Sequence, residues 1–228
     1  YNESQNLPEL MKRIFELGLP ALEVLIIDDA SPDGTGLLAE DLSKRYENRI
    51  HVLHRDRKEG LGPAYLAGYT EALARNSQYI VQMDADLSHP PEFLPKLLES
   101  AEGCDMAIAS RYITGGGVDQ SWGIRRRLLS RLGNMYSRII TNMPIRDATS
   151  GFRCFHRSVL EYLCQQTIRC RGFGFQIEVT YHVWRQGFRL EEIPFVFAER
   201  DSGDSKISMA IIIEAIVRLP QIRLDRKI

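Results

Sequence analysis

The chain has 228 residues, of which 44% are hydrophobic and 26% charged, proportions that are ordinary for a globular protein. This composition excludes a disordered, collagenous or low-complexity protein. Lys and Arg number 29 against 30 Asp and Glu, and a formal net charge of −1 argues against a generally basic nucleic-acid-binding protein. No uncharged apolar run approaches the roughly 18 residues that a membrane-spanning helix needs, because Glu214 ends the longest candidate at residues 207–213.

The first 110 residues alternate short apolar runs with longer stretches of helical periodicity. Strands are predicted at residues 24–27, 50–53, 79–83 and 106–109, and helices between them at residues 35–46, 63–74 and 91–98. This alternation predicts an α/β fold with an open, mostly parallel sheet and helices on both faces.

The second half has a different pattern. A flexible loop is predicted at residues 114–117, helices at 124–143 and 176–185, strands at 151–155 and 190–197, and a polar loop at 202–205 before a last helix from about residue 206. The helix 124–143 has an apolar stripe at 128, 132, 135, 136, 139 and 143, flanked by Arg127, Arg131 and Arg138. Both this helix and the apolar last helix are candidates for amphipathic helices at a membrane surface. The alternatives are solvated arginines for the helix 124–143 and ordinary core packing for the last helix.

Four cysteines, Cys104, Cys154, Cys164 and Cys170, are scattered without a C-x-x-C pair. In a chain of this length such cysteines indicate reduced structural thiols in a reducing compartment. A zinc site would need Cys or His at tighter spacing. Because no linker or internal repeat is visible, we expect a single domain over residues 1–228.

The sharpest local signal, Asp84-Ala85-Asp86, follows the third predicted strand. Residues two apart share a face of a strand, so the carboxylates would lie roughly 6.6 Å apart at about 3.3 Å of rise per residue. One Mg²⁺ can be shared over that distance, since it takes one or two carboxylates and completes its shell with phosphates and water. Open α/β sheets also bind ligands at the carboxyl ends of strands. The alternative is a solvated turn with an Asp helix cap.

A second acid pair, Asp28-Asp29, ends the first predicted strand. Its carboxylates could accept hydrogen bonds from a base or ribose, or could form the acidic pocket of a phosphoreceiver domain. The chain is about twice as long as a receiver and has a second acid pair, which argues against that alternative. Residues 31–35 favour a turn that caps the next helix. Gly60 and Gly62 lack the spacing of a phosphate-binding loop, which favours backbone turn positions.

Three motifs together resemble the inverting glycosyltransferases of sequence family 2. They are Tyr1-Asn2-Glu3, the Asp-Asp-Ala-Ser-Pro-Asp-Gly-Thr segment at 28–35, and the Asp-Ala-Asp-Leu-Ser-His-Pro-Pro segment at 84–91. Within that family the chain is similar to the polyprenol (dolichol) monophosphate mannose synthases, through Ser110-Arg111-Tyr112, Ser150-Gly-Phe-Arg153, and Glu199-Arg200 followed by Gly203-Asp-Ser-Lys206. The resemblance implies a GT-A-type fold. It also implies that the family's first strand is missing from this chain.

The resemblance implies a role for each matching residue. Residues 1 to about 110 would form a nucleotide-binding half, and about 111–228 an acceptor half that ends in an amphipathic helix. The substrate-binding residues would be Asn2 and Glu3 in the nucleotide pocket, Asp28 and Asp29 at the base and ribose, Asp84 at the donor diphosphate, and Lys206 near the phosphates. The catalytic residues would be Asp86, with Arg111, Arg125 and Arg200 on the lipid phosphate or donor phosphates. The metal, Mg²⁺ or Mn²⁺, would be held by Asp84, Asp86 and Ser88, although many relatives have Gln in place of this weaker serine ligand.

The implied activity is inverting transfer of mannose from GDP-mannose to a polyprenyl (dolichyl) phosphate. A phosphate monoester has a second pKa of about 6 and is already a nucleophile at neutral pH, so the site needs no strong general base. A metal on the leaving diphosphate and arginines on the nucleophile would suffice. The alternatives are a UDP-dependent glucosyl or aminosugar transferase and a non-catalytic sugar-nucleotide-binding subunit. The implied partners are a membrane surface at its cytoplasmic face and small membrane subunits, with no nucleic acid.

Overall fold

The computed structural model describes residues 1–119, 122–172, 174–198 and 209–224, with the backbone alone for 209–215. Its strands are β1 (Val24–Asp28), β2 (Ile50–His54), β3 (Tyr79–Gln82), β4 (Met106–Ser110), β5 (Gly117–Val118), β6 (Arg153–His156), β7 (Leu190–Pro194) and β8 (Val196–Phe197). Its helices are α1 (Leu7–Glu16), α2 (Thr35–Arg45), α3 (Leu61–Leu73), the short 3-10 helix η1 (Pro91–Phe93), α4 (Leu94–Ala101), α5 (Ile124–Thr141), α6 (Arg157–Leu163), α7 (Gly174–Arg185) and α8 (Met209–Leu224).

The strands form a four-stranded sheet in the order β3-β6-β4-β7 and two parallel pairs, β1-β2 and β5-β8. In the larger sheet β4 and β7 are parallel, whereas β6 runs antiparallel to both β3 and β4. The chain leaves β4 at Ser110 and enters β6 at the same edge of the sheet. Strand β6 therefore runs in the direction opposite to β4. The predicted α/β class is confirmed, with β6 as the strand of opposite direction.

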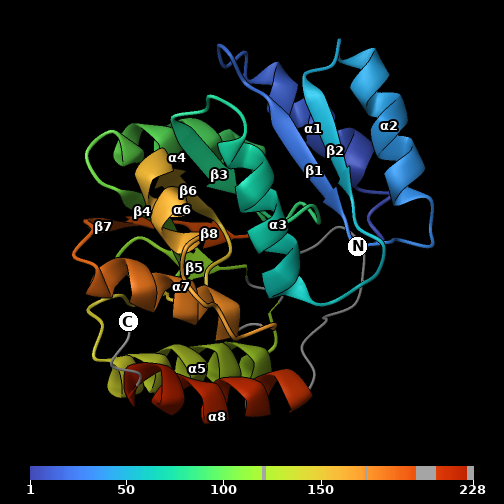
Figure 1. Cartoon of the computed structure of the whole chain (residues 1–228). Helices are drawn as coiled ribbons and strands as arrows, with labels where there is room; N and C mark the ends of the chain where they lie inside the picture. Colours follow the sequence, from blue (N-terminus) through green and yellow to red (C-terminus); the bar gives the residue numbers. More distant parts are fainter. Residues whose placement is uncertain (120–121, 173, 199–208, 225–228) are drawn as a thin grey trace.

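Side-chain alternation along β4 divides the interior into two cores. Met106 and Ile108 pack into the core formed with α3, α6 and α7, whereas Ala107 and Ala109 pack into the core formed with α1, α2 and α4. Successive residues of a strand point to opposite faces, which accounts for this division. Helices therefore cover both faces of the sheet, as the sequence predicts (Figure 1).

Some elements differ from the sequence-based expectation. Helices α1 and α6 and the short strand β5 were not predicted, and residues 190–197 form two strands instead of one. The break falls at Phe195, whose backbone N–H bonds to the carbonyl of Ser110 while its side chain enters the core. Beyond that point β8 pairs with β5. The predicted loop at 202–205 and the first residues of the predicted last helix lie outside the described residues.

Glycines fix the start of α3 against the loop that precedes α7. The backbone N–H of Gly62 donates to the carbonyl of Arg171 at 2.9 Å, and a Cβ at Gly62 would lie 2.5 Å from the carbonyl oxygen of Cys170. Gly60 has a φ of 111°, a conformation that L side chains rarely adopt. These contacts support the interpretation of both glycines as backbone positions.

All four cysteines are free thiols, as the sequence predicts. Within the described residues, no helix combines the length and the apolar character that crossing a membrane requires.

Candidate active site

The acids of the Asp84-Ala85-Asp86 motif lie just beyond the carboxyl end of β3. The Asp86 carboxylate is buried and accepts hydrogen bonds through Oδ1 from the backbone N–H of Ser88, at 3.1 Å, and from the Ser88 hydroxyl. Leu87 between them has a φ of 62°, which closes the turn tightly enough for these bonds to form. The Ser88 hydroxyl therefore donates its hydrogen to Asp86. The role of Ser88 as a metal ligand stays a prediction.

The other acid, Asp84, is oriented from two sides. Its Oδ1 accepts a hydrogen bond from the hydroxyl of Tyr65 at 2.9 Å, and its backbone N–H donates to Nδ1 of His89 at 2.9 Å. Burial raises the pKa of Tyr65 well above its usual value, and the charge of Asp84 raises it further, so the phenol stays protonated as a donor. Because Nδ1 of His89 already accepts a backbone hydrogen, this nitrogen does not serve as a general base.

A network of buried polar side chains holds the carboxyl end of β3 in place. Gln82, the last residue of β3, accepts a hydrogen bond from the Tyr69 hydroxyl and donates to the carbonyl of Gly151 at 2.9 Å and to Oε1 of Gln176 at 3.2 Å. These partners come from α3, α7 and the loop before β6. The network therefore fixes the position of β3 relative to three neighbouring segments.

Arg153 of β6 is fully buried, and its side chain holds the loop at residues 147–151 by hydrogen bonds to backbone carbonyls of that loop. Its guanidinium donates to the carbonyls of Ala148 at 2.8 Å, Ser150 at 2.6 Å and Gln176 at 3.1 Å. Burial lowers its pKa to about 10, which leaves it protonated at neutral pH. The loop places Gly151 beside Asp84, where a Cβ would lie 3.6 and 3.7 Å from the two carboxylate oxygens. The motif at 150–153 thus supports the site, a role that the sequence did not reveal.

Arg111, predicted as a phosphate contact, forms a buried ion pair in the structure. Its Nε and Nη2 donate to the two oxygens of Asp147 at 2.7 Å each, and Nη2 also donates to the Thr149 hydroxyl at 2.8 Å. Burial by itself would lower the pKa of Arg111, but the Asp147 carboxylate outweighs burial and raises it. Burial likewise opposes the ionised form of Asp147, and Arg111 still holds its pKa below the usual value. The guanidinium links the end of β4 to the 147–151 loop, and a contact with phosphate stays a prediction.

The predicted nucleotide-binding residues gather at the carboxyl end of β1. The backbone N–H of Asn2 donates to the Ser31 hydroxyl at 3.0 Å, and that of Glu3 donates to the Thr35 hydroxyl at 2.9 Å. The Asp28 carboxylate is buried and accepts the backbone N–H of Ser31 at 3.3 Å. The amino-terminal segment is therefore held against the loop that follows β1.

Asp29 has a partner that the sequence did not reveal. Its carboxylate pairs with Arg55, which follows β2, and Arg55 also binds Glu59 at 2.8 Å. Asp33, predicted to act in the turn or cap, accepts the backbone N–H groups of Thr35 and Ser4 at 3.1 Å each. The predicted turn at residues 31–35 is confirmed. The predicted side-chain cap is wrong, because the N-cap of α2 is Gly34 and no side chain bonds there as a cap.

Of the remaining predicted site residues, the structure describes only Arg125, which makes no contact with the acid pair. Arg125 is exposed on the first turn of α5, and no hydrogen bond or ion pair joins it to another described residue. Arg200 and Lys206 lie outside the described residues. The described part of the chain holds no cluster of three His, Cys, Asp or Glu side chains that could bind a metal by themselves. Asp84 and Asp86 are therefore the donors to consider, with the rest of the shell coming from substrate and water.

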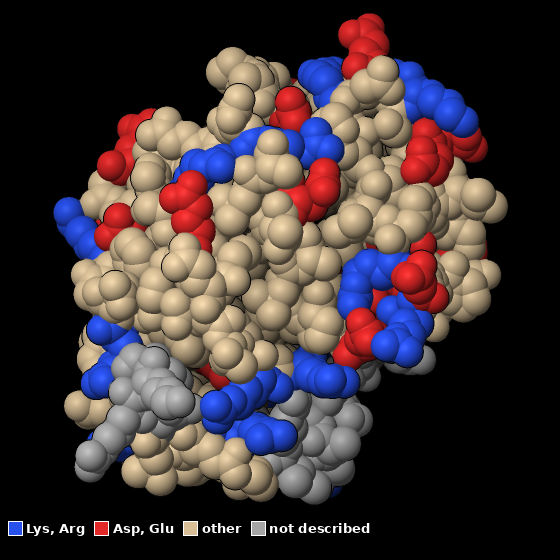
Figure 2. All heavy atoms as spheres, in the orientation of Figure 1, with Lys and Arg blue, Asp and Glu red and all other residues tan. Residues whose placement is uncertain are grey.

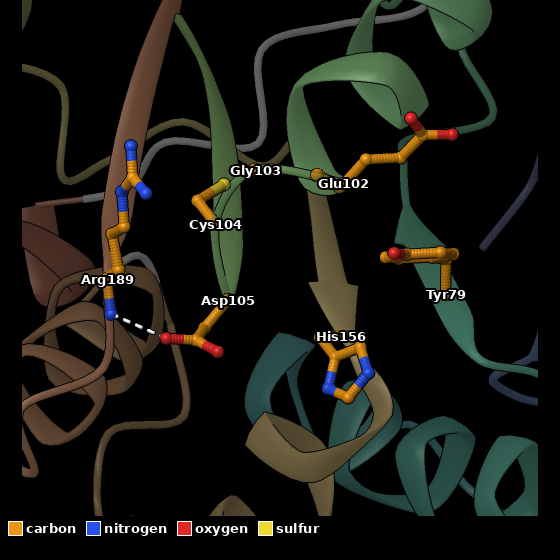
Figure 3. A pocket seen from close by; sticks show the side chains of 8 residues that line it. Tyr79, Glu102, Gly103, Cys104, Asp105, His156 and Arg189 are labelled. Carbon is orange, nitrogen blue, oxygen red and sulfur yellow. Dashed lines mark hydrogen bonds between the residues drawn. The ribbon is translucent and has the colours of Figure 1, made fainter.

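A shallow pocket of about 300 Å³ lies at the opposite edge of the sheet, at the amino ends of β3, β4 and β7 (Figure 3). There the Asp105 carboxylate accepts the backbone N–H of Arg189 at 2.7 Å, and the rings of Tyr79 and His156 meet edge to face. Burial raises the pKa of the Cys104 thiol to about 11, so this thiol is a poor nucleophile at neutral pH. Ligands of open α/β sheets bind at the carboxyl ends of strands, which favours the acid pair over this pocket.

Sequence comparison with known proteins indicates the family of the chain. Residues 1–164 match the model of glycosyl transferase family 2. The polyprenol monophosphomannose synthase of Mycolicibacterium smegmatis is 43% identical over 231 residues, covering 99% of this chain and 86% of the relative. The undecaprenyl-phosphate mannosyltransferase of Micrococcus luteus is 41% identical over 219 residues, covering 96% of this chain and 89% of the relative.

Solved structures share the architecture at low sequence identity. The glucosyl-3-phosphoglycerate synthase of Mycobacterium tuberculosis with bound phosphoglyceric acid superposes with a TM-score of 0.69 at 18% identity, over 97% of this chain and 76% of that one. The same enzyme with Mn²⁺, UDP-glucose and phosphoglyceric acid gives a TM-score of 0.65 at 17% identity, over 96% of this chain and 76% of that one. The GT-A-type fold implied by the motifs is confirmed.

Proposed function

The chain belongs to glycosyltransferase family 2, and we propose that it transfers mannose from GDP-mannose to a polyprenyl phosphate, with inversion at the anomeric carbon. One observation carries this proposal. Two relatives with 41–43% identity over nearly the whole chain are named for mannosyl transfer to polyprenyl phosphates. The acid pair beyond β3 supplies the chemistry that such a transfer requires.

We assign the divalent metal, Mg²⁺ or Mn²⁺, to Asp84 and Asp86. Tyr65 occupies one side of Oδ1 of Asp84, and among the described residues no donor bonds to Oδ2, so this oxygen is available to a cation. Two carboxylates match the protein share of a magnesium site that substrate phosphates complete. A bound metal would offset the negative charge that develops on the departing diphosphate.

The nucleotide is proposed to bind between the two acid pairs, in the half formed by residues 1 to about 110. Asn2 and Glu3 are held at the carboxyl end of β1 beside Asp28 and Asp29. Their side chains offer acceptors for the base and the ribose hydroxyls. The ion pair with Arg55 holds the Asp29 carboxylate in place.

The acceptor phosphate is proposed to bind in the half formed by residues 111–228. A phosphate monoester is a nucleophile at neutral pH, so the site needs cationic groups to hold it and no strong base. Arg125 is an exposed candidate, and Arg200 and Lys206 are carried over from the motif. Because the acceptor is a lipid and all four cysteines are free, we place the enzyme at the cytoplasmic face of a membrane.

The test offers labelled GDP-mannose, UDP-glucose and UDP-N-acetylglucosamine in parallel with a short polyprenyl phosphate and Mn²⁺. The expected product is mannosyl-phosphoryl-polyprenol from GDP-mannose alone, identified by mass spectrometry. Transfer from a UDP-sugar alone would replace the proposal with the alternative transferase. Binding of GDP-mannose without any transfer would support a non-catalytic subunit.

A further inference from the structure

Helix α5 has its polar side buried and its apolar side exposed. The buried residues are Asn134, Ser137 and Thr141. The exposed side chains, with their accessible fractions, are Ile124 (83%), Leu128 (56%), Leu129 (47%), Leu132 (45%), Met135 (53%) and Ile139 (65%). Five of these, at 124, 128, 132, 135 and 139, follow the spacing of one helical face. An exposed apolar row of this length marks an interaction surface.

The buried side of α5 lies directly on the candidate site. Asn134 donates to the Thr149 hydroxyl at 2.9 Å, and Thr149 is also bonded by Arg111. One turn before Asn134, the Tyr112 hydroxyl donates to the Ser130 hydroxyl of the same helix at 2.7 Å. The apolar row is thus separated from the 147–151 loop by the thickness of one helix.

Helix α8 continues the same surface. It lies beside α5 (Figure 1), and the Tyr136 hydroxyl of α5 donates to the carbonyl of Ile216 at 2.8 Å. Ile216, Val217 and Leu224 of α8 are half or more exposed, whereas Leu219 and Ile222 pack inward. Helix α8 therefore adds exposed apolar side chains next to α5.

The charge of this face is positive. The α5 sequence has five arginines and no Asp or Glu, and Arg125, Arg131 and Arg138 are exposed. Figure 2 shows Lys and Arg spheres around the tan lower part of the molecule, where α5 and α8 lie, while most of the Asp and Glu spheres lie elsewhere on that view. An apolar row flanked by arginines is the pattern of helices that bind anionic membranes.

We propose that the exposed row of α5, with the adjoining exposed residues of α8, inserts into the surface of an anionic lipid bilayer. Charge favours lipid over a second copy of the chain, since a symmetric dimer through this face would bring arginines against arginines. Anionic head groups instead complement them. The proposal stands on exposure and charge, and it deepens the proposed function by placing the 147–151 loop next to the membrane that holds the acceptor.

The test is flotation of the full chain with vesicles of phosphatidylcholine alone and with added phosphatidylglycerol. Wild type should float with the anionic vesicles, and high salt should weaken this binding. The variant Leu128→Gln/Leu132→Gln should bind roughly tenfold or more weakly, because it removes two inserted apolar side chains without changing the charge. Arg131→Gln/Arg138→Gln should lose about 25-fold, since each basic residue near an anionic surface contributes about a factor of five.

The matched control is Leu37→Gln, which replaces a leucine of α2 that is 78% exposed and distant in sequence from α5. It should float as wild type does. No flotation of wild type, or equal flotation of all variants, would overturn the proposal. So would a dimer in lipid-free buffer that the double leucine variant dissociates, since a second copy would then cover the face.

Transfer to a water-soluble, short-chain polyprenyl phosphate separates this proposal from the proposed function. The leucine and arginine double variants should retain that activity, which also shows that they are folded. Flotation without any transfer by wild type would contradict the proposed function and leave the membrane surface supported.

Discussion

Tyr65 of α3 donates its phenolic hydrogen to Oδ1 of Asp84 across 2.9 Å, joining a helix to the acid that follows β3. The Tyr65 ring stacks on Phe175 of α7 with a centroid separation of 5.9 Å and an interplanar angle of 7°. The close approach of Gly62 to the carbonyl of Cys170 fixes the start of the same helix. The orientation of Asp84 therefore depends on how α3 packs against α7 and the loop before it.

Tyr65→Phe should weaken the apparent Mn²⁺ affinity. It removes one hydrogen bond from Asp84 and keeps the stacked ring, and loss of such a supporting bond typically costs about 10–100-fold in metal affinity or activity. The measurement is the Mn²⁺ dependence of the transfer rate, together with the melting temperature. Tyr46→Phe, at the end of α2 where the ring stacks on Phe15, is the matched control. An unchanged Mn²⁺ dependence in the Tyr65 variant would show that Tyr65 does not orient a metal ligand.

Arg111 and Asp147 should behave as one structural unit. Removing one partner of a buried pair typically costs about 3–5 kcal/mol, because the other charge is left uncompensated. We therefore expect Arg111→Met and Asp147→Asn each to lower the free energy of unfolding by about that amount, and the double variant to lose less than the sum. Urea denaturation of the three variants measures this coupling. Strictly additive losses would mean that the pair is not coupled, and normal stability of Arg111→Met would favour a purely phosphate-binding role.

Low pH should lower the free energy of unfolding through the Arg111–Asp147 pair. The folded-state pKa of Asp147 is lowered by Arg111, so its contribution to stability is complete above the unfolded-state pKa of about 3.9. It is lost as the pH falls below that value toward the folded-state pKa. We expect the free energy of unfolding to fall less steeply with pH below about 4 in Asp147→Asn than in wild type. Parallel slopes from urea titrations across this range would contradict the prediction.

Local patterns in the sequence predicted most strands and helices, together with both acid pairs and the turn at residues 31–35. The contacts that shape the site are separated along the chain and left no local signal. Arg111 meets Asp147 across 36 residues, and Tyr65 meets Asp84 across 19. A lone arginine in the sequence looks the same whether it faces a phosphate or a carboxylate.

Periodicity also left one ambiguity that the structure resolves. The apolar stripe of the helix 124–143 was visible, but its period does not say which side faces the core. In the structure Leu128, Leu132 and Ile139 are exposed and Met143 is buried.

Helix α1 was missed although Leu7, Leu10, Met11 and Ile14 recur at helical spacing and are all buried. The direction of β6 follows from the path of the chain between strands, which no local pattern encodes.

Two Gly→Ala variants should shift stability in opposite directions. At Gly62 the new Cβ would lie 2.5 Å from the Cys170 carbonyl oxygen and 2.9 Å from the Phe175 ring, and such overpacking costs about 1–3 kcal/mol. At Gly133 in α5 a Cβ would meet nothing within 4 Å, so helix propensity should stabilise the protein by about 1 kcal/mol. Thermal unfolding of both variants tests this. A neutral Gly62→Ala would mean that α3 is free to shift away from the loop.

The central claim is that the acids after β3 carry mannosyl transfer, and Asp86→Asn tests it most directly. The exchange removes the charge and keeps the size, and the remaining amide oxygen can still accept from Ser88. The measurement is the initial rate of mannosyl-phosphoryl-polyprenol formation from GDP-mannose and Mn²⁺, with circular dichroism to confirm folding. We predict a loss of about 100-fold or more in a folded variant, as expected when a group that stabilises the transition state is removed. Turnover at the wild-type rate would contradict the claim and place the chemistry elsewhere.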